Sequence, residues 1–309
     1  MSIEVNPMNQ TEMFEAIRRL KEEKNAVILA HYYQEGPVQD VADYTGDSLY
    51  LSQVAASTDA DIIVFAGVHF MAETAKILSP EKTVLLPVAE AGCPMADMVT
   101  EVRLEQYRKK HPDRVVVCYV NSTARVKALS DVCVTSSNAE KIIKHYKDQK
   151  LLYVPDKNLG AYMKYKYDLD MDLWPGFCCV HNDLTMDDVR TMKAKYPSAQ
   201  LIIHPEAKLE LLQEADYVGS TKGLLEYTIN SDHDEFIVGT EDGILHTMKK
   251  HSPNKTFHIL NSGLKCYDMK LTHLEDVYLA LKHNQFEVTV PDDIREKAFQ
   301  ALDKMLSLS

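Results

Sequence analysis

Short apolar runs that end in polar side chains recur along the chain. They read VILAHYY at 27–33, VVVCYVN at 115–121 and LIIHPE at 201–206. An uninterrupted apolar stretch of this length is typical of a strand that is buried on both faces of a parallel sheet. The pattern therefore predicts three buried strands, each of which delivers polar groups at its carboxyl end.

Three further features follow each of these runs, in the same order and at similar spacing. They are an aspartate twelve residues after the polar strand end, a second apolar run that leads into a helix-like segment, and a third apolar run that ends near a cysteine. The aspartates are Asp43, Asp131 and Asp216, the second runs are 62–67, 151–156 and 236–241, and the cysteines are Cys93, Cys178 and Cys266.

The period of about 85 to 88 residues between these cysteines is close to the size of one small α/β layer domain. We therefore predict an α/β fold of three similar three-layer αβα domains with short parallel sheets. The expected domains are 1–110 with an N-terminal helix, 111–196, and 197–309 with a C-terminal helix. Ligands of open parallel sheets bind beyond the carboxyl ends of the strands, so pseudo-threefold symmetry would direct all three sets of strand ends at one central site.

Two amphipathic helices are predicted at the ends of the repeated region. Asn9 and Glu12 form a capping pattern at the first helix, and Pro291 precedes the start of the second. The apolar stripes consist of Met13, Phe14, Ile17 and Leu20 in the first helix, and of Ile294, Ala298, Ala301, Leu302 and Met305 in the second. We expect both helices to cover the repeated units.

Composition and charge narrow the classes of protein. The chain has 309 residues, of which 45% are hydrophobic, so it can bury a sizeable core. Its net charge of −12 argues against a nucleic-acid partner, because a nucleic-acid groove needs a basic face. The N-terminus lacks the basic start and apolar run of a secretory signal, and no stretch approaches the roughly 18 apolar residues of a membrane span. We therefore expect a cytoplasmic protein with no membrane partner, whose six cysteines are reduced.

The chain lacks several motifs of well-known enzyme classes. It has no GxGxxG dinucleotide loop, no Walker P-loop, no HExxH zinc helix and no GxSxG nucleophile elbow. The sequence therefore argues against a nicotinamide-dependent dehydrogenase and against a nucleotide triphosphatase.

Each repeat contributes one cysteine in the same phase, at Cys93, Cys178 and Cys266. Three thiolates that meet at one point can hold a metal centre, and we favour a [4Fe–4S] cluster, which is normally held by cysteine thiolates. With three protein ligands one iron stays open, and an open iron can polarise a carbonyl or assist the loss of a hydroxyl. A three-cysteine zinc site and three inert buried thiols stay open as alternatives.

The other cysteines carry less information. Cys118 and Cys133 lie inside apolar runs, and we interpret them as core residues. Cys179 adjoins Cys178, so local reasoning does not decide which of these two thiols is the ligand.

Polar side chains end the first strand of every repeat in matched positions. They are His31 and Tyr33, Tyr119 and Asn121, and His204 and Glu206. Histidine, tyrosine and glutamate at strand ends can move protons. Six groups in matched phase favour one shared pocket over six separate contacts with loop backbone.

Hydroxyl groups lie just before helix-like segments in each repeat, at Ser48, Ser136, Ser220 and Thr221. A helix N-terminus presents free N–H groups and a positive dipole end, which suit a phosphate or a carboxylate. Simple helix capping by the serines is the alternative. His181 lies three residues beyond Cys178, a spacing that lets it reach the same pocket.

Together these segments resemble quinolinate synthases of the NadA type. The resemblance rests on AHYYQ, ADYTGDS, GVHFMAETAKIL, GCPMAD, YVNST, TSSNA, PDKNLGAY, the run from Cys178 to His181, IIHPE, ADYVGST, GTEDGILH and the segment of Cys266. They occur in the family's order from about Ala26 to Pro291 and so cover nearly the whole chain.

The resemblance implies a function and a cofactor. Enzymes of this family condense iminoaspartate with dihydroxyacetone phosphate to quinolinate, with loss of phosphate and water, in the de novo biosynthesis of NAD. An L-aspartate oxidase or dehydrogenase would supply the iminoaspartate. The family has three similar α/β domains around a [4Fe–4S] cluster, whose ligands would be Cys93, Cys178 and Cys266.

The resemblance also implies the site residues. Tyr33, Tyr119, His204 and Glu206 would be catalytic, and His31, Ser48, Asn121, Ser136, His181, Ser220 and Thr221 would bind substrate. Two departures stand out: Cys179 occupies a position where the family usually has proline, and the segment from Cys266 to Met269 lacks the CxxC redox pair of some members. A zinc-dependent hydrolase or aldolase and a cluster-bearing sensor are the rival classes; the acidic charge and the many polar strand ends count against a sensor.

Overall fold

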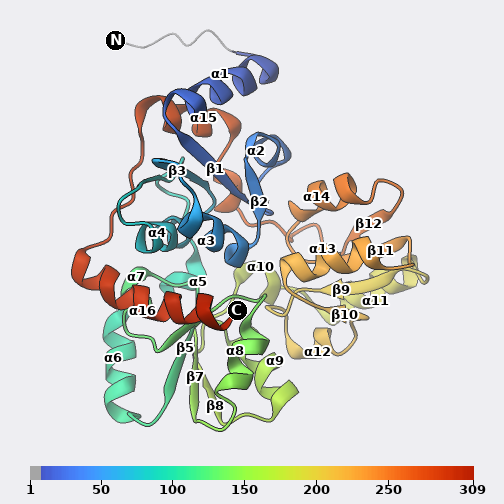
Figure 1. Cartoon of the computed structure of the whole chain (residues 1–309). Helices are drawn as coiled ribbons and strands as arrows, with labels where there is room; N and C mark the ends of the chain where they lie inside the picture. Colours follow the sequence, from blue (N-terminus) through green and yellow to red (C-terminus); the bar gives the residue numbers. More distant parts are fainter. Residues whose placement is uncertain (1–7) are drawn as a thin grey trace.

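The structure, a computed structural model, describes residues 8–309 and contains three parallel sheets with helices around them (Figure 1). The expectation about a secretory signal falls largely on residues 1–7, which lie outside the described residues. No helix between residues 8 and 309 combines the length and the apolar character that a bilayer crossing requires.

Each sheet, with the helices that alternate with its strands, is called a unit here. The first unit contains α1 Gln10–Glu23, β1 Ala26–His31, α2 Gly36–Val41, β2 Tyr44–Gly46, α3 Ser48–Ser57, β3 Ile62–Ala66, α4 His69–Leu78, β4 Thr83–Leu85 and α5 Pro94–Asp97. The second contains α6 Glu101–Lys110, β5 Val115–Tyr119, α7 Ala124–Lys127, β6 Val132–Val134, α8 Ala139–His145, β7 Leu151–Val154, α9 Lys157–Tyr167, β8 Met171–Leu173 and α10 Cys179–Asn182. The third contains α11 Met186–Lys195, β9 Gln200–Ile203, α12 Leu209–Leu212, β10 Tyr217–Val218, α13 Thr221–Asn230, β11 Glu235–Gly239, α14 Ile244–His251 and β12 Thr256–Ile259. The 3₁₀ turn η1 Met269–Leu271 and the helices α15 Leu274–His283 and α16 Asp292–Leu308 follow.

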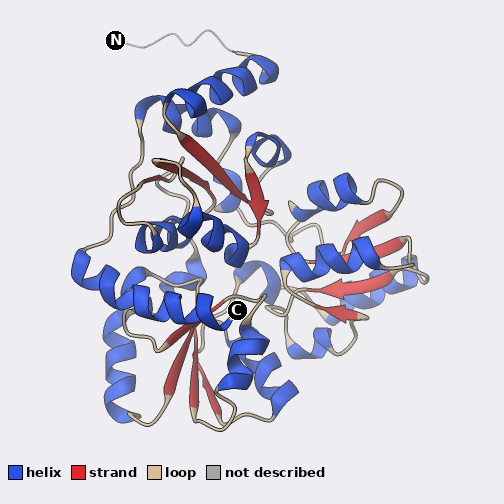
Figure 2. Cartoon of the chain, viewed as in Figure 1, coloured by secondary structure: helices blue, strands red, loops and turns tan. Residues whose placement is uncertain are grey.

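The three sheets share one topology. Their strand orders are β2-β1-β3-β4, β6-β5-β7-β8 and β10-β9-β11-β12, and every pairing is parallel. Figure 2 shows the sheets arranged around a common centre. The prediction of an α/β fold of three similar αβα domains is confirmed. The three predicted apolar runs of each unit form three of its four strands, which are β1, β3 and β4 in the first unit and their counterparts in the other two. The domain boundaries at 110 and 196 stay a prediction.

The matched aspartates have the same structural task in each unit. Asp43 accepts a hydrogen bond from the backbone N–H of Ile28 at 2.8 Å. Its counterparts repeat this contact on the central strand of their own sheet, Asp131 to Val116 N at 2.7 Å and Asp216 to Leu201 N at 2.7 Å. Each carboxylate therefore fixes the edge strand that follows it against the central strand. The aspartates hold the scaffold and lie away from the strand ends that carry the polar groups.

The core has separate parts. One continuous apolar cluster runs from the first sheet to the second and includes residues of α4, β5, β7 and α16. The third sheet is covered on both faces, since Leu201 and Ile203 of β9 belong to one cluster and Ile202 belongs to another. Alternate residues of a buried strand therefore point into different helix layers, as the parallel arrangement requires.

The predicted flanking helices form where expected. Asn9 and Glu12 make a reciprocal capping box at α1, and α16 buries four of its predicted stripe residues, Ala298, Ala301, Leu302 and Met305. The chain beyond the third sheet returns to the other two, because α15 packs on α1 and β3 whereas α16 packs on β6, α7 and α4 (Figure 1). The C-terminal helix thus joins the first and second units, although the sequence placed it with the third.

Candidate active site

A single cavity lies at the carboxyl ends of the central strands, where the three units meet. Its empty space is about 670 Å³, counting the part that is open to solvent, and this volume suits a small-molecule site. Its wall includes His31, Tyr33, Ser48 and Cys93 of the first unit and Tyr119, Asn121, Ser136, Cys178 and His181 of the second. It also includes His204, Glu206 and Thr221 of the third unit, and Cys266 of the segment that follows β12. All but one of the residues singled out from the sequence therefore lie in this cavity.

Ser220 is the exception. It lies in an adjoining pocket, where its hydroxyl accepts a hydrogen bond from the N–H of Gly223 at 3.1 Å and caps α13. Ser220 is therefore a helix cap, which was the alternative interpretation of the sequence, whereas the next residue, Thr221, faces the cavity. At α3 the cap is Asp47 rather than Ser48, so the hydroxyl of Ser48 does not serve as the helix cap.

His31 and His204 have matched geometry. Nδ1 of His31 accepts the backbone N–H of Tyr33 at 3.1 Å, and Nδ1 of His204 accepts that of Glu206 at 3.3 Å. Burial lowers the pKa of each imidazole to about 3, so both are neutral near pH 7. A neutral imidazole that accepts at Nδ1 carries its proton on Nε2. Both histidines are therefore hydrogen-bond donors, and Nε2 of His204 lies 3.3 Å from the hydroxyl of Ser136.

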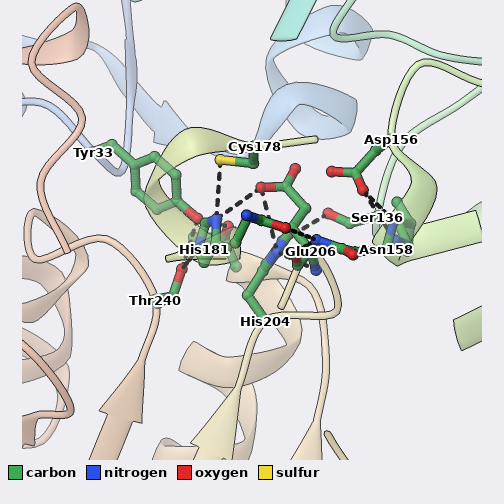
Figure 3. Close-up of polar contacts among 12 residues, drawn as sticks. Tyr33, Ser136, Asp156, Asn158, Cys178, His181, His204, Glu206 and Thr240 are labelled. Atoms are coloured by element: carbon green, nitrogen blue, oxygen red, sulfur yellow. Dashed lines mark hydrogen bonds and ion pairs between the residues drawn. The ribbon is translucent and has the colours of Figure 1, made fainter. Parts of the chain in front are cut away.

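Glu206 is the centre of a buried polar network (Figure 3). Its carboxylate accepts the hydroxyl of Tyr119 at 2.6 Å and lies 2.8 Å from Nδ1 of His181. Burial alone would raise the pKa of Glu206, but the neighbouring His204 and the hydrogen bonds of His181 and Tyr119 outweigh burial and hold this pKa below its usual range. Burial and the adjacent carboxylate in turn raise the pKa of the Tyr119 phenol. The site therefore presents an ionised carboxylate beside a protonated tyrosine.

The proton positions extend from Glu206 to the first unit. Because an ionised carboxylate only accepts, Nδ1 of His181 donates to it. In the neutral imidazole, Nε2 of His181 then accepts from the hydroxyl of Thr240 at 2.9 Å. The phenol of Tyr33 lies 2.8 Å from Thr240 and 2.9 Å from Thr221, so it donates to the former and accepts from the latter. A directed chain of hydrogen bonds thus joins Thr221, Tyr33, Thr240, His181 and Glu206.

One acceptor in the cavity wall has no protein partner. The amide oxygen of Asn121 is sealed from solvent and accepts no hydrogen bond from residues 8–309. A buried acceptor costs free energy unless it is satisfied. Asn121 is therefore suited to accept a hydrogen bond from a bound ligand.

The three cysteines of the repeat also line the cavity. Cys93 and Cys178 precede the first residues of α5 and α10, and Cys266 follows β12. Burial raises the pKa of all three thiols, to about 12 in Cys266. Such thiols become thiolates only beside a cation, and a bound metal provides one. Three soft sulfur donors facing one space fit an iron–sulfur centre.

A second donor set overlaps this one. Among residues 8–309, the metal-ligand atoms that gather within 4.8 Å of one another belong to Cys178, His181 and Glu206. This spacing suits a single ion. Within the described residues, the three cysteines do not form a group at this spacing, although all three line the same cavity.

The remaining cysteines lie as interpreted from the sequence. Cys118 and Cys133 are fully buried in the core, on the paired strands β5 and β6. Cys179 is exposed, whereas Cys178 faces the cavity. The structure therefore places Cys178, and not its neighbour, beside the other two thiols of the repeat.

Sequence reasoning missed several polar residues of the site. Thr240 links Tyr33 to His181, and Glu241 is a fully buried carboxylate in the cavity wall. A signal was present for Glu241, because it ends the second apolar run of its repeat as Asp156 does in the preceding one. Thr240 had no signal, since its role arises only from its contacts with the other two units.

The fold and this cavity define a class: a three-unit α/β enzyme with an internal site of histidines, tyrosines, a carboxylate and thiols. A sequence model of the family described as "Quinolinate synthetase A protein" matches residues 15–307. The chain is 50% identical to the quinolinate synthase of Clostridium kluyveri over 302 residues, covering 97% of this chain and 100% of that protein. It is 49% identical to quinolinate synthase 2 of Methanosarcina acetivorans over 295 residues, covering 96% and 95% of the two chains. The chain belongs to the quinolinate synthase family.

Proposed function

We propose that this chain condenses iminoaspartate with dihydroxyacetone phosphate to quinolinate, with loss of phosphate and water, for the de novo biosynthesis of NAD in the cytoplasm. The observation that carries the proposal is the convergence of matched strand ends and three thiols from the repeats on one buried cavity. Iminoaspartate would come from an enzyme that oxidises or dehydrogenates L-aspartate. Family membership supports the proposal.

The cofactor in this proposal is a [4Fe–4S] cluster held by Cys93, Cys178 and Cys266. Its iron without a protein ligand would supply Lewis acidity for the departure of a hydroxyl group. The presence of three buried thiols in the wall of one cavity supports this donor set. A single ion at Cys178, His181 and Glu206 is the competing assignment, and metal analysis separates the two.

The substrates carry two carboxylates and one phosphate, and the cavity has to hold them with neutral donors. Within the described chain, no Lys or Arg side chain lines the cavity. The donors that remain are the Nε2–H groups of His31 and His204, the hydroxyls of Ser48 and Ser136, and the N-termini of the ten-residue helices α3 and α13, the second of which begins at Thr221. The buried amide oxygen of Asn121 accepts an N–H or O–H of the bound intermediate.

Proton transfer in this proposal is organised around Glu206. Its ionised carboxylate removes a proton from the substrate carbon or nitrogen, and the protonated phenol of Tyr119, 2.6 Å away, returns one. His181, Thr240 and Tyr33 connect this carboxylate with the opposite wall of the cavity through hydrogen bonds. His204 orients the substrate from Nε2 and keeps Glu206 in place through its Nδ1 contact with the backbone.

The proposal is tested by assaying quinolinate formation from iminoaspartate and dihydroxyacetone phosphate under anaerobic conditions. The Glu206→Gln variant keeps the shape and the contact with Tyr119 but loses the basic oxygen. It should retain the metal of the wild-type protein and lose turnover by about 10²-fold or more. Near-normal turnover in this variant would remove the proton-transfer role, and no quinolinate from metal-loaded wild-type protein would refute the function.

A further inference from the structure

The loop that carries Cys266 is held by a buried carboxylate. Glu241 follows β11, is fully buried and lines the cavity. Its Oε1 accepts the backbone N–H of Cys266 at 3.1 Å, and its Oε2 accepts that of Gly243 at 2.8 Å. The carboxylate thus fixes the backbone of the third cysteine from inside the protein.

Lys270 completes the arrangement and crosses to the first unit. Its Nζ lies 2.9 Å from Oε1 of Glu241 and 3.1 Å from Oδ1 of Asp242. It also donates to the backbone carbonyl of Tyr33 at 2.7 Å. The ammonium group therefore makes one hydrogen bond, to Tyr33, and two ion pairs, with Glu241 and Asp242. A single side chain therefore joins the strand end of Tyr33 in the first unit to the end of β11 in the third.

Two neighbouring contacts hold the same loop against the first unit. The side-chain amide of Gln34 donates to the carbonyl of Met269 at 2.8 Å. The carboxylate of Asp268 accepts the N–H of Gly92 at 3.2 Å, and Gly92 directly precedes Cys93. The two cysteine-bearing segments of the first and third units are thus tied together, with Lys270 and Glu241 at the buried end of the connection.

We propose that Glu241 and Lys270 are positioning residues, which hold the Cys266 loop against the first unit and so keep the third thiol in the cavity. Neither residue needs to touch the substrate for this role. The proposal rests on the proposed function for what the thiols bind, because a cluster needs three cysteines at fixed mutual positions. The positioning itself is a property of the metal-free chain.

The test measures how fast iodoacetamide alkylates each cysteine in metal-free protein, by peptide mass spectrometry. In Lys270→Met the rate at Cys266 should rise roughly ten-fold or more, because local opening exposes the thiol. The rate at Cys178, which lies in the second unit, should stay within about two-fold of wild type. An unchanged rate at Cys266 would overturn the proposal.

Lys265→Met is the matched control. Its ammonium lies 3.7 Å from the same Asp242, but half of its side chain is exposed, at 52%. This variant should leave Cys266 as protected as in wild type; equal exposure of Cys266 in both lysine variants would contradict a specific role of Lys270. In protein loaded with iron, Lys270→Met should also release iron to a chelator roughly ten-fold faster than Lys265→Met.

The buried core cysteines Cys118 and Cys133 report on folding, since they become reactive only if the chain unfolds. If Lys270→Met unfolds, the double variant Glu241→Gln with Lys270→Met removes both charges together. Its alkylation rate at Cys266 is then compared with that of wild type. Protection of Cys266 equal to wild type in that double variant would refute the proposal. Because labelling is done without metal or substrate, a failed quinolinate assay leaves this result interpretable.

Discussion

The hydrogen-bond chain through Thr240 predicts the outcome of a small change. Thr240 is fully buried, and its hydroxyl lies 2.8 Å from the phenol of Tyr33 and 2.9 Å from Nε2 of His181. Thr240→Val replaces this hydroxyl with a methyl group of similar size and leaves the backbone as it is. The variant therefore interrupts the connection between the two walls of the cavity with little change in packing.

The expected cost follows from which groups lose a partner. The phenol of Tyr33 can turn its O–H to Thr221, 2.9 Å away, and so keeps a partner, whereas Nε2 of His181 loses the one hydrogen bond it makes within the described chain. A buried group left without a partner costs about 1–3 kcal/mol. The free energy of unfolding should fall by about this amount, and not by twice as much. Since the relay is cut, kcat should fall by about 10²-fold, with a much smaller change in KM.

The measurement compares kcat, KM and urea unfolding for anaerobically purified wild type and variant. Thr228→Val is the matched control, because Thr228 is equally buried and loses one hydrogen bond, to the carbonyl of Leu225 at 2.8 Å, away from the cavity. The control should lose stability but keep kcat. If Thr240→Val kept kcat within about two-fold of wild type at normal iron content, the directed chain of hydrogen bonds would have no part in turnover.

Three further results are expected. Unfolded His31 takes up a proton below about pH 6.5, whereas the folded residue, with a pKa of about 3, stays neutral until about pH 3. The free energy of unfolding therefore decreases as the pH falls through this window. In urea unfolding of metal-free protein, His31→Gln should lose about 1.4 kcal/mol less per pH unit than wild type. Cys178→Ala should abolish stoichiometric iron binding while Cys179→Ala retains it, and the opposite result in iron analysis would exchange the two thiols. Asp216→Ala should reduce the free energy of unfolding by about 1–3 kcal/mol through its lost bond to Leu201 N, and an unchanged denaturation midpoint would show that the matched aspartates do not hold the edge strands.

The strands and the flanking helices could be predicted from the sequence because their signals are local. An apolar run such as residues 27–33 has one stable environment, between two helix layers of a parallel sheet. The stripe at Ala298, Ala301, Leu302 and Met305 fixes one buried face of α16. What the stripe does not specify is which sheet it covers, and α16 packs on the second unit and on α4 rather than on the third unit.

The residues of the candidate site could be predicted from the sequence to a similar extent. The cysteines and the six strand-end residues recur at matching positions of the three sequence repeats. This recurrence indicated them as site residues, because equivalent positions of similar units lie at equivalent places in the fold. Thr240 and Lys270 carry no such signal, because Thr240 contacts residues of the other two units and Lys270 reaches Tyr33 of the first unit, tens to hundreds of residues away in the chain. Ser220 shows the opposite error: a hydroxyl before a helix has a local use as a cap, and local contacts decided its place.

The central claim is that the thiols of Cys93, Cys178 and Cys266 hold a [4Fe–4S] cluster at the meeting point of the three units. It is tested most directly by measuring iron, acid-labile sulfide and zinc in protein purified without air. The account predicts about four irons and four sulfides per chain, with loss of both when any one of the three cysteines is replaced by alanine. One zinc per chain without sulfide, or full quinolinate turnover in protein free of iron, would contradict it.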